Sequence, residues 1–317
     1  MRNLVFIAIA LVLIALTAWV LLGNRDTVEP TFELSASERP IPDSPYWSEA
    51  DRWVDVDGVT ARVRIEGPSD APVLVLIHGF SYSLESWEAW ATDLAADYRV
   101  VRFDLPGHAL TGPDPQARYS VDETVEFTRV LLDVLAIEQA SLVGNSLGGL
   151  VAWRLAANYP DRVERLVLLA PGGFSINGVT EDPVPVPAAV AFFLTQGPEF
   201  GVAAASQALF GDPERMPEDL PGRVHSLMRQ PGVGAALVER LEVFTLPDPR
   251  ADLARVEAPA LIVWGERDVM VPSAHAQEFA AHMPDARILT YADLGHVPHE
   301  EAPARTLVDV RAFLDAN

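Results

Sequence analysis

The chain has 317 residues, of which 49% are hydrophobic and 21% are charged, so it can bury a large core. Its formal net charge of −22, from 45 acidic and 23 basic residues, repels phosphate backbones and disfavours nucleic acid as a partner. Because there is no cysteine and no lysine, thiol nucleophiles, thiolate metal sites, disulfides and Schiff-base catalysis are excluded.

The N-terminal segment is predicted to insert into a membrane. Residues 4–22 are nineteen consecutive positions without a charge, and about 20 apolar residues span a bilayer as a helix. This run exceeds the apolar region of about 7–15 residues in a cleaved signal peptide. We therefore favour an uncleaved anchor over a removed signal within residues 1–25, and expect the rest of the protein on the extracytoplasmic side.

The next segment, residues 26–46, is predicted to be a linker, because it holds four prolines among polar residues and shows no periodicity. The folded domain is expected over residues 47–317. It opens with two short alternating runs, at residues 52–57 and 60–65. They flank Gly58 and predict an antiparallel hairpin.

The remaining pattern alternates between buried strands and helices. Short runs that are entirely or largely apolar, typical of buried parallel strands, occur at residues 73–77, 99–103, 140–143, 165–169, 260–264 and 287–291. Helical spacing occurs at residues 87–95, 121–135, 147–158, 274–282 and 302–314. This order predicts an α/β fold, with a mostly parallel central sheet and helices on both faces. The gap between the fourth and fifth of these strands predicts an inserted helical cap at about residues 174–249.

Ser146 is the candidate nucleophile. It lies in the pattern G-x-S-x-G between a predicted strand and a predicted helix, which is the arrangement of a nucleophile elbow. The small residues Gly144 and Gly148 provide the clearance that such a sharp turn requires. An ordinary strand-to-helix turn with a capping serine is the alternative. A catalytic serine also needs a base, because a free hydroxyl is a weak nucleophile.

Candidate partners for Ser146 follow two later strands. Asp268 lies in the loop after the 260–264 run, with Glu266 as a less favoured substitute, and His296 follows the last predicted strand. The order Ser, Asp, His along the chain is the order of a serine triad in this kind of sheet. His299 is a reserve for the base.

An oxyanion hole needs two backbone N–H groups. We expect them at Leu147, the residue after the nucleophile, and at Phe80, in the loop after the first buried strand. His78 in that loop is expected to be structural. Asp104 and His108 follow another strand end, and a structural role is favoured for both, with Asp104 kept as an alternative triad acid.

Five motifs in order resemble the α/β-hydrolase superfamily: HGF at 78–80, DLPGH at 104–108, GNSLGG at 144–149, WGERD at 264–268 and LGH at 294–296. The resemblance covers about residue 47 to the end and implies the triad Ser146, Asp268 and His296. A serine nucleophile distinguishes the chain from haloalkane dehalogenases and epoxide hydrolases, which carry aspartate there. The chain departs from the pattern at Ala109, where glycine often follows DLPGH.

The resemblance implies a serine hydrolase, and we expect a carboxylesterase or lipase acting on a small-molecule ester. The anchor favours a lipid-like substrate, as do apolar cap residues, although these can also pack on one another: Val190, Phe192, Phe193, Leu194, Phe200, Leu209 and Phe210. Two alternatives stay open. GNSLGG also resembles the C–C bond hydrolases of this fold, and a membrane-tethered ligand-sensing protein would keep a slow triad. No cofactor and no metal are expected, and the oligomeric state is left open.

Overall fold

The structure is a computed structural model that describes residues 39–316. The predicted anchor at residues 4–22 lies outside the described residues, as does most of the predicted linker. Within residues 39–316, no helix is long and apolar enough to cross a membrane.

The described end of the predicted linker, residues 39–46, contains neither helix nor strand. It nevertheless packs against the domain. The guanidinium of Arg39 donates hydrogen bonds to the carbonyls of Leu110 and Thr111, each at 2.9 Å, and lies 4.1 Å from the centre of the Trp53 ring. Among the described residues, close contact with the domain is therefore already present at Arg39, before Trp47.

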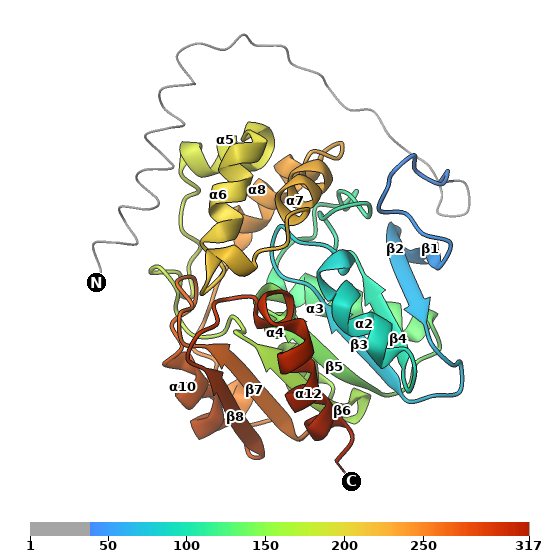
Figure 1. Ribbon diagram of the computed structural model, residues 1–317, viewed down its shortest axis with the longest axis vertical. Helices are drawn as coiled ribbons and strands as arrows, with labels where there is room; N and C mark the ends of the chain where they lie inside the picture. The colour runs from blue at the N-terminus through green and yellow to red at the C-terminus, as the bar shows by residue number, and fades with distance from the viewer. Residues whose placement is uncertain (1–38, 317) are drawn as a thin grey trace.

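One eight-stranded sheet forms the centre of the molecule, in the order β1-β2-β4-β3-β5-β6-β7-β8 (Figure 1). The antiparallel hairpin consists of β1 (Asp51–Val56) and β2 (Val59–Glu66), joined by Asp57 and Gly58. Both turn residues have positive φ, as a two-residue hairpin turn requires. The parallel strands are β3 (Val73–Ile77), β4 (Arg99–Phe103), β5 (Ala140–Asn145), β6 (Val163–Leu169), β7 (Ala260–Gly265) and β8 (Ala286–Tyr291).

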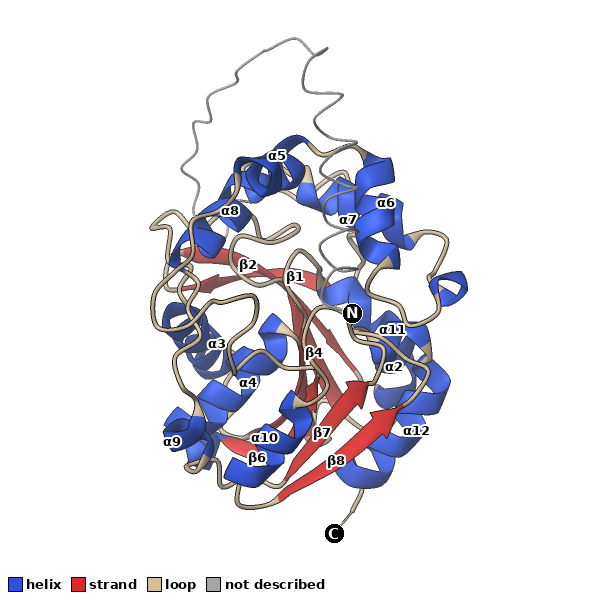
Figure 2. Ribbon diagram, turned by 90° about the vertical axis from the view of Figure 1, so that its left-hand side faces the viewer, coloured by secondary structure: helices blue, strands red, loops and turns tan. Residues whose placement is uncertain are grey.

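Helices cover both faces of the sheet. Figure 2 shows α3 (Val121–Val134), α4 (Leu147–Asn158) and α10 (His275–His282) on one side, and α2 (Glu88–Leu94) and α12 (Pro303–Leu314) on the other. Shorter elements are η2 (Leu84–Trp87), η3 (Pro160–Arg162), η4 (Pro213–Arg215), α9 (Arg250–Leu253) and α11 (Pro298–Glu301). The predicted α/β fold with a mostly parallel sheet is confirmed.

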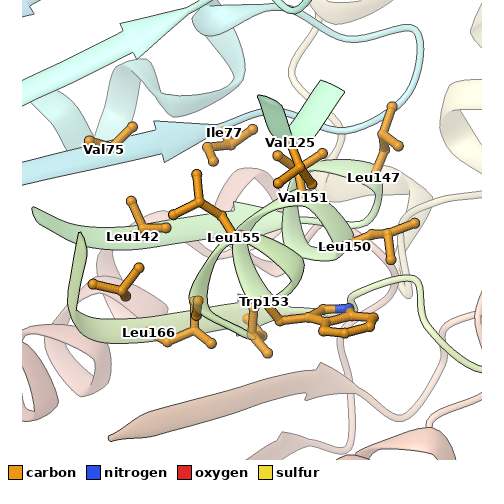
Figure 3. Packing of buried hydrophobic residues seen from close by; sticks show 14 of the residues in the cluster. Val75, Ile77, Val125, Leu142, Leu147, Leu150, Val151, Trp153, Leu155 and Leu166 are labelled. Atoms are coloured by element: carbon orange, nitrogen blue, oxygen red, sulfur yellow. The ribbon is translucent and has the colours of Figure 1, made fainter. Parts of the chain in front are cut away.

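Two apolar clusters fill the space between sheet and helices. Val75 and Ile77 point toward α4 (Figure 3), whereas the alternate residues Leu74 and Leu76 face α2 and α12. Because successive side chains of a strand point to opposite faces, a strand covered on both faces is apolar at most positions. This is why the short apolar runs identify the parallel strands.

The predicted cap is an inserted group of helices between β6 and β7. It contains α5 (Ala188–Gln196), α6 (Glu199–Gln207), α7 (Leu220–Met228) and α8 (Val233–Val243). These helices share their own buried cluster, which includes Leu194 and Phe210, whereas Phe200 is 63% exposed. The cluster also contains Tyr82 and Val297 of the main domain, so the cap packs directly on the loops that follow β3 and β8.

A buried ion cluster joins the hairpin to the loops beside the site. The Arg62 side chain on β2 is fully buried, and its guanidinium lies 2.8 Å from Asp51, 2.6 Å from Glu85 and 3.4 Å from Asp104. Such a cluster is stable only while its charges balance, because an unpaired buried charge is expensive. Arg62 therefore helps to hold η2 and the loop after β4.

Replacing Arg62 by methionine is expected to lower the free energy of unfolding by about 3–5 kcal/mol, because three carboxylates lose a buried counter-charge. Urea unfolding of the two proteins measures the loss. Arg52→Met, at an exposed position of β1, is the matched control, and should change stability by less than about 0.5 kcal/mol. Equal losses in the two variants would show that burial of the cluster adds nothing.

Candidate active site

Ser146 lies at a strained turn between β5 and α4. Its backbone has φ of 54° and ψ of −114°, which a residue with a side chain adopts only where its surroundings impose it. A Cβ on Gly144 would lie 2.3 Å from the Gly148 carbonyl oxygen, and a Cβ on Gly148 would lie 2.1 Å from that of Ile77. Both positions therefore need glycine, as the sequence predicts.

Asp268 and His296 lie in direct contact. His296 Nδ1 is 2.8 Å from Asp268 Oδ2, and the Asp268 side chain is fully buried. The other carboxylate oxygen accepts hydrogen bonds from the N–H groups of Met270 and Val271, while the Trp264 indole donates to Oδ2 at 3.2 Å. When the Nδ1–H group donates a hydrogen bond to this fixed carboxylate, the neutral imidazole has its free, proton-accepting atom at Nε2.

Asn145 ties the Ser146 turn to the loop that carries His296. Its amide nitrogen donates to the carbonyls of His296 and Leu169, each at 3.0 Å, and its side chain is buried. Sequence reasoning missed this residue, although a polar side chain at the end of an otherwise apolar strand was a visible signal. The contact brings the backbones of the candidate nucleophile and the candidate base together.

The loop after β3 runs beside Ser146. A Cβ placed on Gly79 would lie 3.1 Å from Asn145 Oδ1 and 3.4 Å from Ser146 Cβ, so the backbone of this loop lies close to the Ser146 turn. Within residues 39–316, the N–H groups of Phe80 and Leu147 donate to no other residue. Leu147 is the first residue of α4, where the helix dipole favours developing negative charge. Two unpaired donors are thus available near Ser146.

Asp104, the alternative acid, has a different role. One of its carboxylate oxygens accepts the Leu84 N–H at 2.9 Å, and the other accepts the Leu110 N–H at 3.2 Å. Ala109, where the chain departs from the family pattern, has φ of 43°, in the region that favours glycine. Asp104 therefore supports this strained loop, and it is Asp268 that contacts His296.

Two buried histidines, His78 and His108, lie in the loops that follow β3 and β4. His78 Nε2 accepts the Leu105 N–H at 2.9 Å, so His78 Nδ1 carries the proton and donates to the Gly79 carbonyl. Burial lowers the pKa of His78 to about 4 and lowers that of His108 well below its usual value. Both rings are neutral at physiological pH, and the expected structural role of His78 agrees with these bonds.

The two reserve candidates, His299 and Glu266, do not contact the Asp268–His296 pair. His299 is buried with its ring stacked on Trp87 at 4.2 Å between centroids, and burial lowers its pKa to about 3. Glu266 accepts a hydrogen bond from the Thr290 hydroxyl at 3.2 Å. Among the described residues, no group of three or more acidic or histidine side chains could hold a metal ion.

The chain resembles known proteins over most of its length. Residues 72–303 match a family model described as alpha/beta hydrolase fold. The chain is 33% identical over 246 residues to the dihydrolipoyllysine-residue acetyltransferase component of an acetoin cleaving system from Pseudomonas putida; the match covers 76% of this chain but only 63% of that protein. It is 28% identical over 247 residues to the pimeloyl-[acyl-carrier protein] methyl ester esterase of Nitrosomonas europaea, covering 77% of this chain and 96% of the esterase.

A solved structure extends the similarity to the fold. The 2-hydroxy-6-oxo-6-phenylhexa-2,4-dienoate hydrolase from Rhodococcus sp. strain RHA1 superposes with a TM-score of 0.74. The match covers 84% of this chain and 98% of that hydrolase, at 22% identity. At this identity the likeness concerns the fold and not the reaction.

The His299→Phe variant is expected to flatten the pH dependence of stability, because phenylalanine can stack on Trp87 but cannot be protonated. The pKa of His299 is about 3 when folded and 6.5 by its ordinary value, so as pH falls below 6.5 the unfolded chain binds the proton first. Stability due to neutral His299 is present above pH 6.5 and is lost between pH 6.5 and 3. At pH 5 this loss is about 2 kcal/mol.

Urea unfolding at pH 7 and pH 5 measures this difference. Between the two pH values, the wild type should lose about 2 kcal/mol more than His299→Phe. Comparing each protein with itself cancels the change in packing that phenylalanine brings. Equal losses in the two proteins would show that His299 is protonated as readily in the folded state as in the unfolded state.

Proposed function

The chain belongs to the alpha/beta hydrolase family, and on that basis we propose that it is a serine hydrolase that cleaves carboxylic esters through an acyl-enzyme. One observation carries the proposal: a fully buried Asp268 holds His296 at 2.8 Å, in the loop that Asn145 ties to the strained turn at Ser146. This set of groups is that of a nucleophile, its base and the acid that orients the base.

In the proposed mechanism, the Ser146 hydroxyl attacks the ester carbonyl while His296 Nε2 takes its proton. Negative charge develops on the carbonyl oxygen, where the N–H groups of Phe80 and Leu147 stabilise it. The C–O bond to the alcohol then breaks, and His296 returns the proton to the departing alcohol. A water molecule, deprotonated by His296, then attacks the acyl carbon; the bond from that carbon to Ser146 Oγ breaks, the acid leaves, and His296 returns the proton to Ser146.

The surroundings favour an apolar acyl group. Tyr82 and Val297, which lie close in sequence to Phe80 and His296, belong to the same buried cluster as the cap residue Leu194. An acyl chain bound beside this cluster would therefore contact mainly hydrocarbon. One relative, from Nitrosomonas europaea, is named as a pimeloyl-[acyl-carrier protein] methyl ester esterase. This name also supports an ester of an acyl group as the substrate.

Three of the four cap arginines are held by buried or backbone partners, whereas the fourth, Arg215, is 38% exposed and lies 2.8 Å from Asp293. Arg223 lies 2.7 Å from the buried Glu300 carboxylate, Arg229 donates to three backbone carbonyls of the α5 end, and Arg240 donates to two carbonyls and the Thr124 hydroxyl. None of these three is free to pair with a substrate carboxylate. This observation favours a neutral ester over the acidic substrate of a C–C bond hydrolase.

Ser146→Ala is expected to lower turnover of p-nitrophenyl esters by at least about 1,000-fold, because no other group replaces the nucleophile. Release of p-nitrophenol from esters of increasing acyl length measures turnover and sizes the acyl site. Ser273→Ala, outside the site, should keep wild-type rates. An apolar acyl site predicts higher kcat/KM for medium and long chains than for acetate.

The alternatives give different results in the same assay. A folded wild-type protein that turns over no ester but cleaves a vinylogous diketone would be a C–C bond hydrolase. Release of a single equivalent of product would instead indicate a ligand-sensing protein. Similar activity on every acyl length would contradict the lipid-like substrate but not the serine mechanism.

We also propose that residues 4–22 anchor the enzyme in a membrane, with the catalytic domain on the extracytoplasmic side. The uncharged length of this run supports the proposal. The full chain is expected in the membrane fraction after a high-salt wash, and a chain lacking residues 1–25 in the supernatant. Protease added to spheroplasts should digest the domain. Full chain in the supernatant would contradict the anchor.

A further inference from the structure

We propose that Glu301 is a positioning residue that fastens the cap to the loop carrying the catalytic base. This inference rests on the proposed function, in which His296 is that base. Glu301 ends α11, five residues after His296, and its side chain is fully buried. It lies outside the triad and does not contact the His296 ring.

The Glu301 carboxylate accepts three backbone hydrogen bonds from two separate loops. Its Oε2 accepts the N–H groups of Gly211 at 2.9 Å and Gly295 at 2.7 Å, and its Oε1 accepts the N–H of Asp212 at 2.9 Å. Gly211 and Asp212 belong to the cap insertion, whereas Gly295 directly precedes His296. One buried carboxylate therefore joins the two loops.

The two loops also touch backbone to backbone, and we call residues 209–212 together with residues 293–296 the cap junction. The His296 N–H donates to the Leu209 carbonyl at 2.7 Å. A Cβ on Gly295 would lie 2.3 Å from that carbonyl oxygen, and a Cβ on Gly211 would lie 2.6 Å from the Asp293 carbonyl oxygen. Glycine at both positions allows this approach.

The acid loop meets the same cap residue. Arg267, which precedes Asp268, donates from its guanidinium to the Gly211 carbonyl at 3.1 Å and from its N–H to the Leu294 carbonyl at 3.0 Å. The acid and base of the triad are therefore both held against residue 211. Asn145 holds the His296 carbonyl and Asp268 holds its ring, and the cap junction adds contacts to the His296 N–H and to Gly295.

Loss of the carboxylate would leave three N–H groups without their acceptor in a buried site, which costs free energy unless the loops separate to reach water. Separation moves the His296 backbone, and a shift of about 1 Å at a reacting group can lower the rate by about 100-fold. A defect in the cap junction should therefore appear in kcat more than in KM.

Glu301→Gln is the diagnostic variant, because glutamine has nearly the same shape but only one acceptor oxygen. If that oxygen replaces Oε2, the amide nitrogen faces the Asp212 N–H; if it replaces Oε1, the amide faces the N–H groups of Gly211 and Gly295. At least one of the three hydrogen bonds is lost either way. The neighbouring Glu300 offers a matched control, since it is also buried and also joins α11 to the cap, through Arg223 at 2.7 Å.

In the full-length protein, Glu301→Gln is expected to lower kcat for p-nitrophenyl esters by about 10- to 100-fold with KM changed less than threefold. Glu300→Gln should keep kcat within about twofold, because glutamine can still accept from Arg223. Hydrogen exchange at residues 209–212 and 293–297 is expected to accelerate in Glu301→Gln and not in Glu300→Gln. Gly211→Ala, which crowds the Asp293 carbonyl, should reproduce both effects of Glu301→Gln.

Wild-type kcat in Glu301→Gln, or equal losses of kcat in the two glutamine variants, would overturn the proposal. So would accelerated exchange spread over the whole domain, since that result indicates general destabilisation. The exchange measurement needs no catalysis. Selective acceleration at the cap junction in a wild-type protein that lacks ester turnover would uphold the junction and refute only the proposed function.

Discussion

The backbone at Ser146 takes a conformation that an isolated chain avoids, and hydrogen bonds from the surrounding segments hold it in that conformation. The Ser146 N–H donates to the Leu169 carbonyl at 3.0 Å, and the Ser146 carbonyl accepts from Leu150 at 2.9 Å and Gly172 at 3.1 Å. These bonds come from both neighbouring elements, β6 and α4, so the strain at one residue is distributed over the centre of the sheet. The arrangement is possible only because residues 144 and 148 are glycines, which have no side chain to collide with the neighbouring backbone.

The strands and the positions of Asp268 and His296 after two of them could be predicted from sequence for a common reason. A parallel strand covered on both faces is largely apolar, and polar residues become frequent in the loop that follows its carboxyl end. The apolar run at residues 73–77 coincides with β3, and Asp268 and His296 follow β7 and β8 as expected. At these strand ends, the apolar pattern that predicts the strand is followed directly by the polar residue that predicts the chemistry.

The supporting contacts could not be predicted, because they join residues far apart in the chain. Glu301 meets Gly211 across 90 positions and Asn145 meets His296 across 151. A glutamate in a helix near the C-terminus has the pattern of a solvated residue, and only the tertiary structure buries it. The apolar residues of the cap likewise do not mark its helix ends: α6 ends at Gln207, although Leu209 and Phe210 also pack in the cap cluster.

The insertion between β6 and β7 is usually regarded as a replaceable module. The cap junction shows that the structural boundary of this insertion differs from its limits in the sequence. Residues 209–212 lie in the middle of the insertion by sequence, yet Gly211 hydrogen-bonds both Glu301 and Arg267 of the main domain. A chimaera that exchanges the whole insertion would remove part of the support of the triad. Grafts that replace α5 and α6, or α7 and α8, while retaining this segment would respect the true boundary.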